Sequence, residues 1–168
     1  MATAPAWTLR TIDRIDAVDP DAWDRLATPP ERPANPFLSH RFLLALERSG
    51  SATRETGWQP FHLLLEDEAG TLRGALPAYL KSHSQGEYIF DYAWADAFRR
   101  AGGQYYPKAL SAVPFTPATG PRLLVAASDP DADALRRGLA EGAQRITAEL
   151  GLSSFHVNFV NDEDAPAL

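Results

Sequence analysis

The amino-acid sequence predicts one α/β domain in which helices pack on a mixed β-sheet. The chain has 168 residues, of which 45% are hydrophobic and 23% charged, so it is long and apolar enough to bury a core. Apolar periodicity gives the order strand, helix, helix, hairpin, irregular centre, strand, helix, strand. A hairpin followed by a β-α-β unit is typical of a mixed sheet flanked by helices.

The first third of the chain supplies one strand and two helices. Residues 7–12 alternate weakly and form the first expected strand. Asp19 followed by Pro20 is a helix start, and Ser39 caps a second helix that ends at Gly50. A proline-rich connection, 28–36, separates them. The apolar positions of the two helices are Ala22, Trp23, Leu26, Phe42, Leu43 and Leu46.

A β-hairpin follows. Residues 61–66 alternate as a strand, 66–70 form the turn, and 71–81 return. Gly74 and Pro77 in the returning strand indicate a bulge or an edge position.

The second half begins with a short strand at 87–92 and a short helix at 92–100, and continues after a loop with a strand at 123–126. Asp131 or Asp133 caps a long helix closed by Gly151, and 154–160 is the last strand. The acidic stretch 161–168 is expected to be an unpacked polar tail. The inner face of the long helix is formed by Leu135, Leu139, Ile146 and Leu150.

The connection at 104–122 is the strongest candidate for a binding surface. It contains four prolines, Pro107, Pro114, Pro117 and Pro121, among aromatic and aliphatic residues. Proline restricts both itself and its predecessor, so the segment is predicted to be a stiff loop. Long loops that are costly to order are often functional.

Composition and spacing exclude several function classes. A net charge of −6 argues against general nucleic-acid binding, and the absence of cysteine excludes disulfides and thiolate chemistry. No signal peptide or membrane-spanning run is present, so a cytoplasmic protein is expected. The four histidines lack metal-ligand spacing, and there is neither a Gly-x-Ser-x-Gly elbow nor a Walker loop.

Polar and aromatic residues gather between Lys81 and Arg122. Asp91 could pair with an amine or take its proton, and His83 could act as a general base near neutral pH. The alternative makes Asp91 a turn residue or helix cap, and Phe90, Trp94 and Phe98 core residues. Four aromatic residues could line a groove for a peptide or sugar: Tyr92, Trp94, Tyr105 and Tyr106.

The same segment carries a family resemblance. Residues 80–100, 105–108 and 113–124, together with 35–43 and 151–159, closely resemble bacterial predicted N-acyltransferases. These are FemAB-like, or peptidoglycan biosynthesis/recognition, proteins of the GNAT superfamily. The resemblance implies a GNAT-like (acyl-CoA N-acyltransferase-like), largely antiparallel mixed sheet flanked by helices. It also implies a longer two-half protein, of which residues 1–168 would be a single N-terminal half-domain.

The implied chemistry is amide-bond formation on a small-molecule or peptide amine, with acyl-coenzyme A or aminoacyl-tRNA as donor for the full-length protein. No cofactor site is evident in the chain. The stretch that is most similar to a pyrophosphate-binding loop, residues 99–104, ends in Gln104 and is expected to end a helix instead of starting one. Asp91 or His83 would help to keep the amine neutral. Lys108 or a backbone amide near Thr119 would stabilise the oxyanion. The remaining substrate-binding candidates are Lys81, Phe115, Thr116 and Arg122.

Two alternatives to an enzyme stay open. One is a non-catalytic module that binds a cell-wall peptide or a partner protein. The other is a structural half that docks onto a C-terminal half, and it predicts an exposed apolar patch and dimerisation of the isolated chain.

Overall fold

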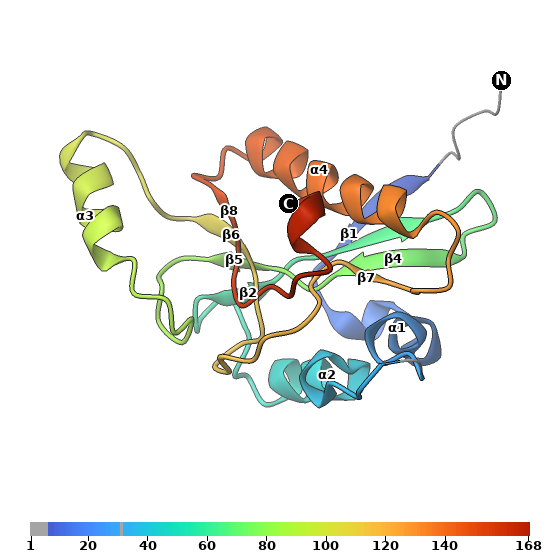
Figure 1. Cartoon of the computed structure of the whole chain (residues 1–168). Coiled ribbons are helices and arrows are strands. Elements are labelled where there is room, and N and C mark those ends of the chain that lie inside the picture. The colour runs from blue at the N-terminus through green and yellow to red at the C-terminus, as the bar shows by residue number, and fades with distance from the viewer. Residues whose placement is uncertain (1–6, 31) are drawn as a thin grey trace, which may run out of the picture.

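The computed structural model describes residues 7–30 and 32–168, and it contains two four-stranded sheets (Figure 1). The first sheet has the order β1-β3-β4-β7 and the second β2-β5-β6-β8. Their bounds are β1 Thr8–Ile12, β2 Trp58–Pro60, β3 His62–Glu66, β4 Leu72–Leu76, β5 Tyr79–Lys81, β6 Lys108–Ser111, β7 Leu124–Val125 and β8 Phe155–Val157. The α-helices are α1 Pro20–Ala27, α2 His40–Arg48, α3 Tyr92–Arg100 and α4 Ala132–Glu149.

The predicted hairpin joins the two sheets. Its first arm is β2 and β3 in succession, and its second arm is β4 and β5, interrupted at Pro77 and Ala78. The N–H of Phe61 donates to the carbonyl of Ala78 across the interruption, at 2.8 Å. Pro77 thus lies at a break between β4 and β5. Both strands are internal in their sheets, so the predicted edge position is not found. The predicted bulge is present in the returning strand beside Gly74: Leu65 pairs with Gly74 and Glu66 with Leu72, so Arg73 is the extra residue.

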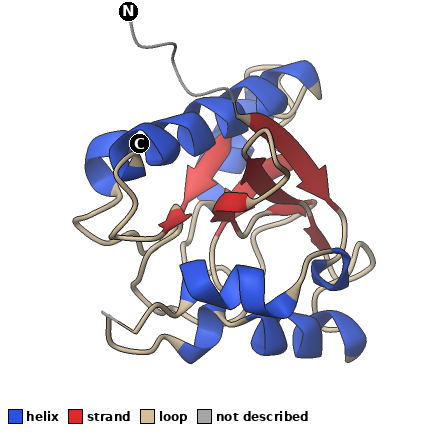
Figure 2. Cartoon of the chain, turned by 90° about the vertical axis from the view of Figure 1, so that its right-hand side faces the viewer, coloured by secondary structure: helices blue, strands red, loops and turns tan. Residues whose placement is uncertain are grey.

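All strand pairs are antiparallel except β6 with β8, which run parallel and are connected through α4. The prediction of a mixed, largely antiparallel β-structure flanked by helices is therefore confirmed. Figure 2 shows α4 on one face of the sheets and α1 with α2 on the other. None of the helices within 7–30 and 32–168 has the length and apolarity to cross a bilayer.

The core lies on both faces of the first sheet because successive strand residues point to opposite sides. Leu64 packs toward α1 and α2 with Trp23 and Leu124. Its neighbours Leu63 and Leu65 pack toward α4. Both faces are buried, which explains the continuous apolar run that the sequence has here.

The helix starts follow the sequence closely. Asp19 accepts a hydrogen bond from Ala22 N–H at 2.8 Å, and Ser39 accepts one from Phe42 N–H at 3.3 Å. Asp131 occupies the position before α4 but makes no capping bond with its side chain. Leu150, predicted on the inner face of this helix, is exposed and lies just after the last helical residue, at the C-cap.

Two predictions for the centre are wrong. Residues 87–92 form no strand: Tyr88 has a φ of 59°, and Glu87 and Asp91 both turn inward. The segment 104–122 is not loop throughout, because it contains the fully buried strand β6. Pro107 directly precedes that strand and Pro114 follows it, so the prolines border the strand without interrupting it.

The acidic C-terminal stretch packs against the body, contrary to the expected free tail. Asp164 is completely buried and accepts hydrogen bonds from the N–H groups of Arg122 and Leu123, at 2.5 and 2.9 Å. A short 3₁₀ turn, Ala165–Ala167, follows beside α4. The C-terminal residues therefore hold the start of β7.

Candidate functional site

The candidate site lies on the face of the second sheet that α2 also approaches. Lys81 on β5 and Lys108 on β6 are register partners, so their side chains leave the sheet on the same side. Trp58 on β2 is in turn the partner of Lys81. The connection after β5 folds over these side chains and encloses both lysines, whose residues are 0% exposed.

Lys108 is the centre of a buried charge network. Its amine donates to Glu87 Oε2 at 2.9 Å, to Asp91 Oδ2 at 2.6 Å and to Ser84 Oγ at 3.1 Å. The Tyr105 hydroxyl also donates to Asp91 Oδ2, at 2.8 Å. Three donors of an ammonium are thus matched by three acceptors, which is what a buried lysine requires.

Lys81 lies beside this network with weaker partners. Its Nζ is 3.7 Å from the centre of the Trp58 ring, donates to the carbonyl of Gln85 at 3.3 Å, and is 4.0 Å from Glu87 Oε1. Burial lowers the pKa of Lys81 to about 7, against the opposing attraction of Glu87. Burial likewise raises the pKa of Glu87 above its usual range. The two shifts bring the pKa values of Lys81 and Glu87 toward each other, because burial disfavours the charged form of each.

The network has unused acceptor capacity. Glu87 Oε1 and Asp91 Oδ1 are buried and make no hydrogen bond. Burial acts to raise the pKa of Asp91, but hydrogen bonds from Lys108, Ser84 and Tyr105 outweigh it and hold the pKa below its ordinary value. Asp91 is consequently a fixed carboxylate, with one oxygen free to accept another proton donor.

Two imidazoles border the network. His156 on β8 is the register partner of Leu110 and therefore faces the side on which Lys108 lies; its Nε2 is 2.7 Å from Ser154 Oγ. Burial, and then the charge of Lys108, lowers the pKa of His156. Burial, and then the charge of Lys81, also lowers the pKa of His83. The Nδ1 of His83 accepts a hydrogen bond from Gln85 N–H at 3.2 Å. Both imidazoles are thus neutral at pH 7 and can accept protons.

The structure brings together five of the residues that the sequence singled out, namely Lys81, Asp91, Tyr105, Tyr106 and Lys108. Tyr106 joins the network through its hydroxyl, 2.6 Å from Ser84 Oγ. The His83 side chain accepts its hydrogen bond from Gln85 N–H and not from a member of the Lys108 network. Sequence reasoning did not select Ser84, Glu87 and His156. The available signals were the position of the first two between Lys81 and Asp91 and that of His156 on the polar side of the last strand.

The other selected residues lie apart from the network. Phe115 packs beside Trp58, with ring centres 5.4 Å apart. Thr116 bonds to the carbonyl of Pro114 and Thr119 is exposed. Arg122 is completely buried, and its guanidinium donates to the carbonyls of Ala118, Gly120, Pro121 and Asn158. Arg122 therefore stabilises the loop before β7.

Helix α3 buries none of its residues, and together with residues 88–90 just before it the helix carries an exposed apolar, mostly aromatic surface, called here the aromatic surface of α3. The helix stands away from the rest of the molecule in Figure 1. Phe90 is 82% and Trp94 75% exposed, so the core interpretation of Phe90, Trp94 and Phe98 is wrong. Asp91 does occupy the position before the helix, but its side chain bonds to Lys108 instead of capping. The other members of this surface are Tyr88, Ile89 and Tyr92.

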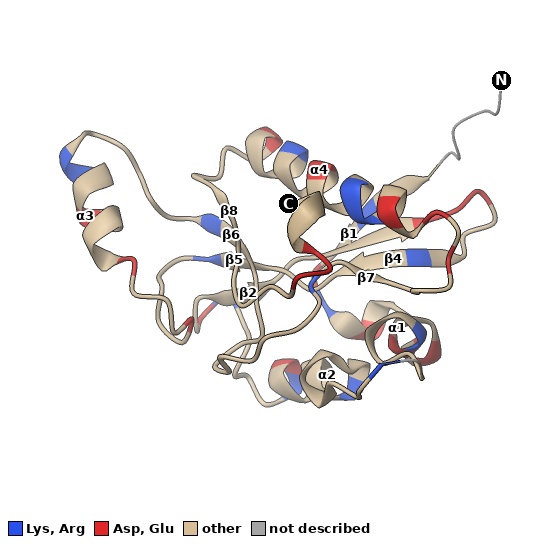
Figure 3. Ribbon diagram, in the orientation of Figure 1, with Lys and Arg blue, Asp and Glu red and all other residues tan. Residues whose placement is uncertain are grey.

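The start of α4 does not fit the phosphates of an acyl donor. The helix that follows β7 is α4, whose start is surrounded by carboxylates (Figure 3). Asp129 and Asp131 there pair with Arg73, at 2.9 and 3.7 Å, and Asp133 lies in the first turn. Negative charge at a helix N-terminus opposes the binding of a pyrophosphate. No group of side chains in 7–30 or 32–168 has the makings of a metal site.

Comparison with known proteins identifies the family. No curated protein matches the chain in sequence. Among solved structures, the aminoglycoside 6′-N-acetyltransferase AAC(6′)-Ih from Acinetobacter baumannii is similar, with 12% identity, a TM-score of 0.49, and coverage of 96% of this chain and 84% of that one. The model of the FemAB-like family, described as peptidoglycan biosynthesis/recognition, matches residues 14–168. The chain belongs to the FemAB-like family.

Proposed function

We propose that this chain provides the acceptor side of an N-acyltransferase that forms an amide bond on an amine, such as an amino acid or a peptidoglycan-related peptide. The observation that carries the proposal is the buried network around Lys108, in which two carboxylates each keep one oxygen without a hydrogen bond. Membership of a family described by peptidoglycan biosynthesis/recognition supports the substrate class.

The chemistry requires a neutral amine and a proton acceptor. An amine that attacks an activated acyl group forms a C–N bond and must lose a proton before the leaving group departs. Asp91 would accept a hydrogen bond from that amine through its free oxygen, since Lys108 and Tyr105 fix its other oxygen. Lys81 and His83, both of lowered pKa, would accept the proton.

The candidate oxyanion donors are already engaged. The amine of Lys108 has three acceptors, and the N–H of Gly120 donates to the carbonyl of Phe159 at 3.1 Å. Because an oxyanion needs donors that are free to meet it, we place the acyl-donor side outside these residues. Acyl-coenzyme A and aminoacyl-tRNA are the proposed donors, and the acidic start of α4 is a further reason to place their phosphates elsewhere.

Turnover tests the proposal directly. The protein is incubated with acetyl-coenzyme A or aminoacyl-tRNA and a lysine-containing stem peptide, and the amide product is measured by mass spectrometry. We expect Asp91→Asn to reduce turnover by about 10²-fold, since it removes the carboxylate that would position the attacking amine, and misplacing a reacting group by about 1 Å can cost this much. Glu68→Gln, which removes an exposed carboxylate in the β3–β4 turn, is the matched control. Equal turnover by folded Asp91→Asn and wild type would refute the role of Asp91.

A non-catalytic binding module is the second candidate, and the aromatic surface of α3 favours it. Phe90 and Trp94 are exposed in the described chain. Leaving large aromatic side chains in water is unfavourable, and exposed apolar patches often mark binding sites. Binding of a stem peptide or glycan fragment without any turnover, and its loss in Trp94→Ser, would support the module over the transferase. Titration calorimetry gives this result independently of the donor.

A further inference from the structure

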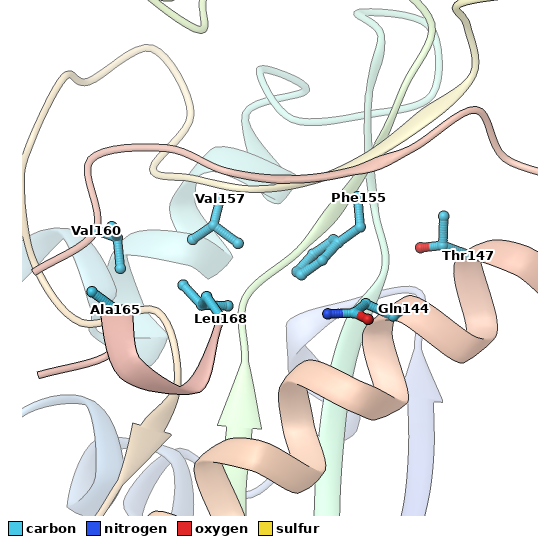
Figure 4. A pocket seen from close by; sticks show the side chains of 7 residues that line it. All are labelled: Gln144, Thr147, Phe155, Val157, Val160, Ala165 and Leu168. Carbon is cyan, nitrogen blue, oxygen red and sulfur yellow. The ribbon is translucent and has the colours of Figure 1, made fainter.

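Two cavities at the edges of the second sheet differ in charge. The cavity between β8, α4 and the C-terminal turn has a volume of about 490 Å³, and no charged side chain lines it (Figure 4). The other has a volume of about 440 Å³ and lies near β2, the strand at the opposite edge. Its lining includes an exposed arginine, Arg54, and the polar side chains of Gln59 and Ser82. This second cavity, called here the arginine cavity, has the volume of a small-molecule site, for which about 300–1,000 Å³ is typical.

The arginine cavity lies on the face of the sheet opposite to the charge network. Gln59 and Leu80 are register partners, and each is next in the chain to a member of the Trp58–Lys81 pair. Because successive strand residues point to opposite faces, the side chains of Gln59 and Leu80 leave the sheet away from the network. Lys81 and Tyr106 border both the cavity and the network. A ligand bound here would leave the carboxylates of the network free, and its binding does not depend on the proposed acyl transfer.

A tight turn between α2 and β2 fixes the position of Arg54. The hydroxyl of Thr56 donates to the carbonyl of Ser51 at 2.9 Å, and the N–H of Gly57 donates to the carbonyl of Arg54 itself at 3.1 Å. Gly57 has a φ of 72°, and the His83 ring occupies the space that a Cβ atom there would need. The turn is thus held against the connection after β5, so a ligand would meet an arginine whose backbone is already ordered.

The polar side chains of the arginine cavity are free to donate hydrogen bonds. Those of Arg54, Gln59 and Ser82 form no hydrogen bond or ion pair with any residue of 7–30 or 32–168. No carboxylate lines the cavity, and Leu80 and Pro107 add apolar surface. A planar guanidinium binds a carboxylate through two parallel hydrogen bonds. The lining therefore suits an anion that carries an apolar group.

We propose that the arginine cavity binds a small organic carboxylate, which pairs with Arg54 and rests its apolar part against Leu80 and Pro107. An N-acylated amino acid and the C-terminal residue of a peptide share this chemistry. A phosphate dianion fits less well, because the net charge of −6 opposes each added negative charge and the amine of Lys81 lies over Trp58 on the opposite face.

The edge of β2 does not suit a peptide bound as an added strand. Trp58 N–H donates to the carbonyl of Thr53 at 2.9 Å, Pro60 has no N–H, and Gln59 between them pairs with Leu80 on β5. The carbonyls of an added strand would therefore find no donor along β2. Side chains are left to hold the ligand.

A neighbouring cavity of about 290 Å³ shares Arg54 and brings Asp13 and Glu47 near it. Glu47 is engaged, because its two oxygens accept the N–H of Ile15 at 3.1 and 2.9 Å. Asp13 is exposed, so its negative charge is the one expected to weaken the binding of an anion at Arg54.

Titrations followed by the amide NMR signals of the protein test the proposal at neutral pH and low salt. The probe is N-acetylleucine, and its neutral analogue N-acetylleucinamide is the control ligand. We expect the carboxylate to bind about tenfold more tightly than the amide and to shift the signals of Arg54, Gln59 and Ser82, because the guanidinium pairs only with the charged group. A peptide with a C-terminal leucine, tested in parallel, shows whether the cavity prefers the end of a chain or a single amino-acid derivative, and tighter binding of either supports the proposal.

Variants locate the site. Arg54→Gln should weaken binding of N-acetylleucine about tenfold and leave that of the amide unchanged, whereas Asp13→Asn should strengthen binding of the acid. Arg48→Gln, at an exposed position outside the cavity, is the matched control. The proposal is overturned if acid and amide bind equally, if Arg54→Gln binds the acid like wild type, or if no saturable shift appears up to about 10 mM ligand. Binding of inorganic phosphate as tight as that of N-acetylleucine would equally overturn it.

Discussion

Lys108 neutralises two buried carboxylates, so its amine is the residue-level feature on which the site depends. We expect Lys108→Met to lower the free energy of unfolding by about 3–5 kcal/mol, because Glu87 and Asp91 would be left as uncompensated buried charges. Adding Glu87→Gln and Asp91→Asn should recover much of the loss. Urea denaturation provides the measurement. Arg14→Met, which breaks an exposed pair with Asp16, is the control and should change stability by about 0.5 kcal/mol or less. A similar small change for Lys108→Met would contradict the network.

Lys81 makes stability depend on pH in a defined direction. In the folded protein its amine loses its proton near pH 7, whereas the unfolded chain keeps it to about the ordinary value of 10.5. Between these values the unfolded state binds more protons, so the free energy of unfolding contributed by this residue rises with pH. We expect Lys81→Met to remove that rise between pH 7 and 9. Identical pH dependence of wild type and variant would show that Lys81 is not desolvated.

Residue patterns predicted the network only in part. Asp91, Tyr105, Tyr106, Lys81 and Lys108 were selected because polar and aromatic residues cluster in one segment. The pairing of Lys81 with Lys108 could not be predicted, since it depends on the register of β5 with β6. Long-range register is set by tertiary packing and leaves no local signature in a four-residue strand.

At the scale of elements, α3 is the helix that contributes least to the fold. Its bounds agree with the predicted helix at 92–100, and the interpretation that would have placed Trp94 and Phe98 in the core is the one that the structure contradicts. Periodicity identifies an apolar face and does not say what covers it.

Loss of the α3 aromatics should therefore be tolerated. We expect Trp94→Ser to change the free energy of unfolding by about 0.5 kcal/mol or less and to reduce binding of a hydrophobic dye. Trp58→Ala, at a fully buried position on β2, should cost about 3–5 kcal/mol. Thermal unfolding of both variants compares them. A large destabilisation by Trp94→Ser would mean that α3 packs against the body in solution.

At the scale of the whole molecule, Asp164 fastens the C-terminal residues to the middle of the chain. The order of strands and helices could be predicted from the sequence. The acidic stretch 161–168 has no apolar pattern, so its packing against the body could not be predicted. The buried carboxylate of Asp164 holds this stretch in place by accepting two hydrogen bonds from backbone N–H groups.

Asp164→Ala should release this attachment. The N–H groups of Arg122 and Leu123 would lose their acceptor, which costs about 1–3 kcal/mol for each buried group left unsatisfied. We expect faster hydrogen exchange at both amides and earlier protease cleavage after residue 157. Unchanged exchange at Arg122 and Leu123 would contradict the role of Asp164.

The parallel pairing of β6 with β8 also bears on the order of events during synthesis on the ribosome. The hairpin and the charge network join segments that emerge in close succession, whereas β6 must wait for all of α4 before its parallel neighbour exists. Contacts between distant segments form late because closing the intervening chain is entropically costly. A nascent chain is therefore expected to bury its lysines first and to carry an open sheet edge at Ala109 and Ser111 until β8 arrives, so this edge stays exposed to aggregation the longest.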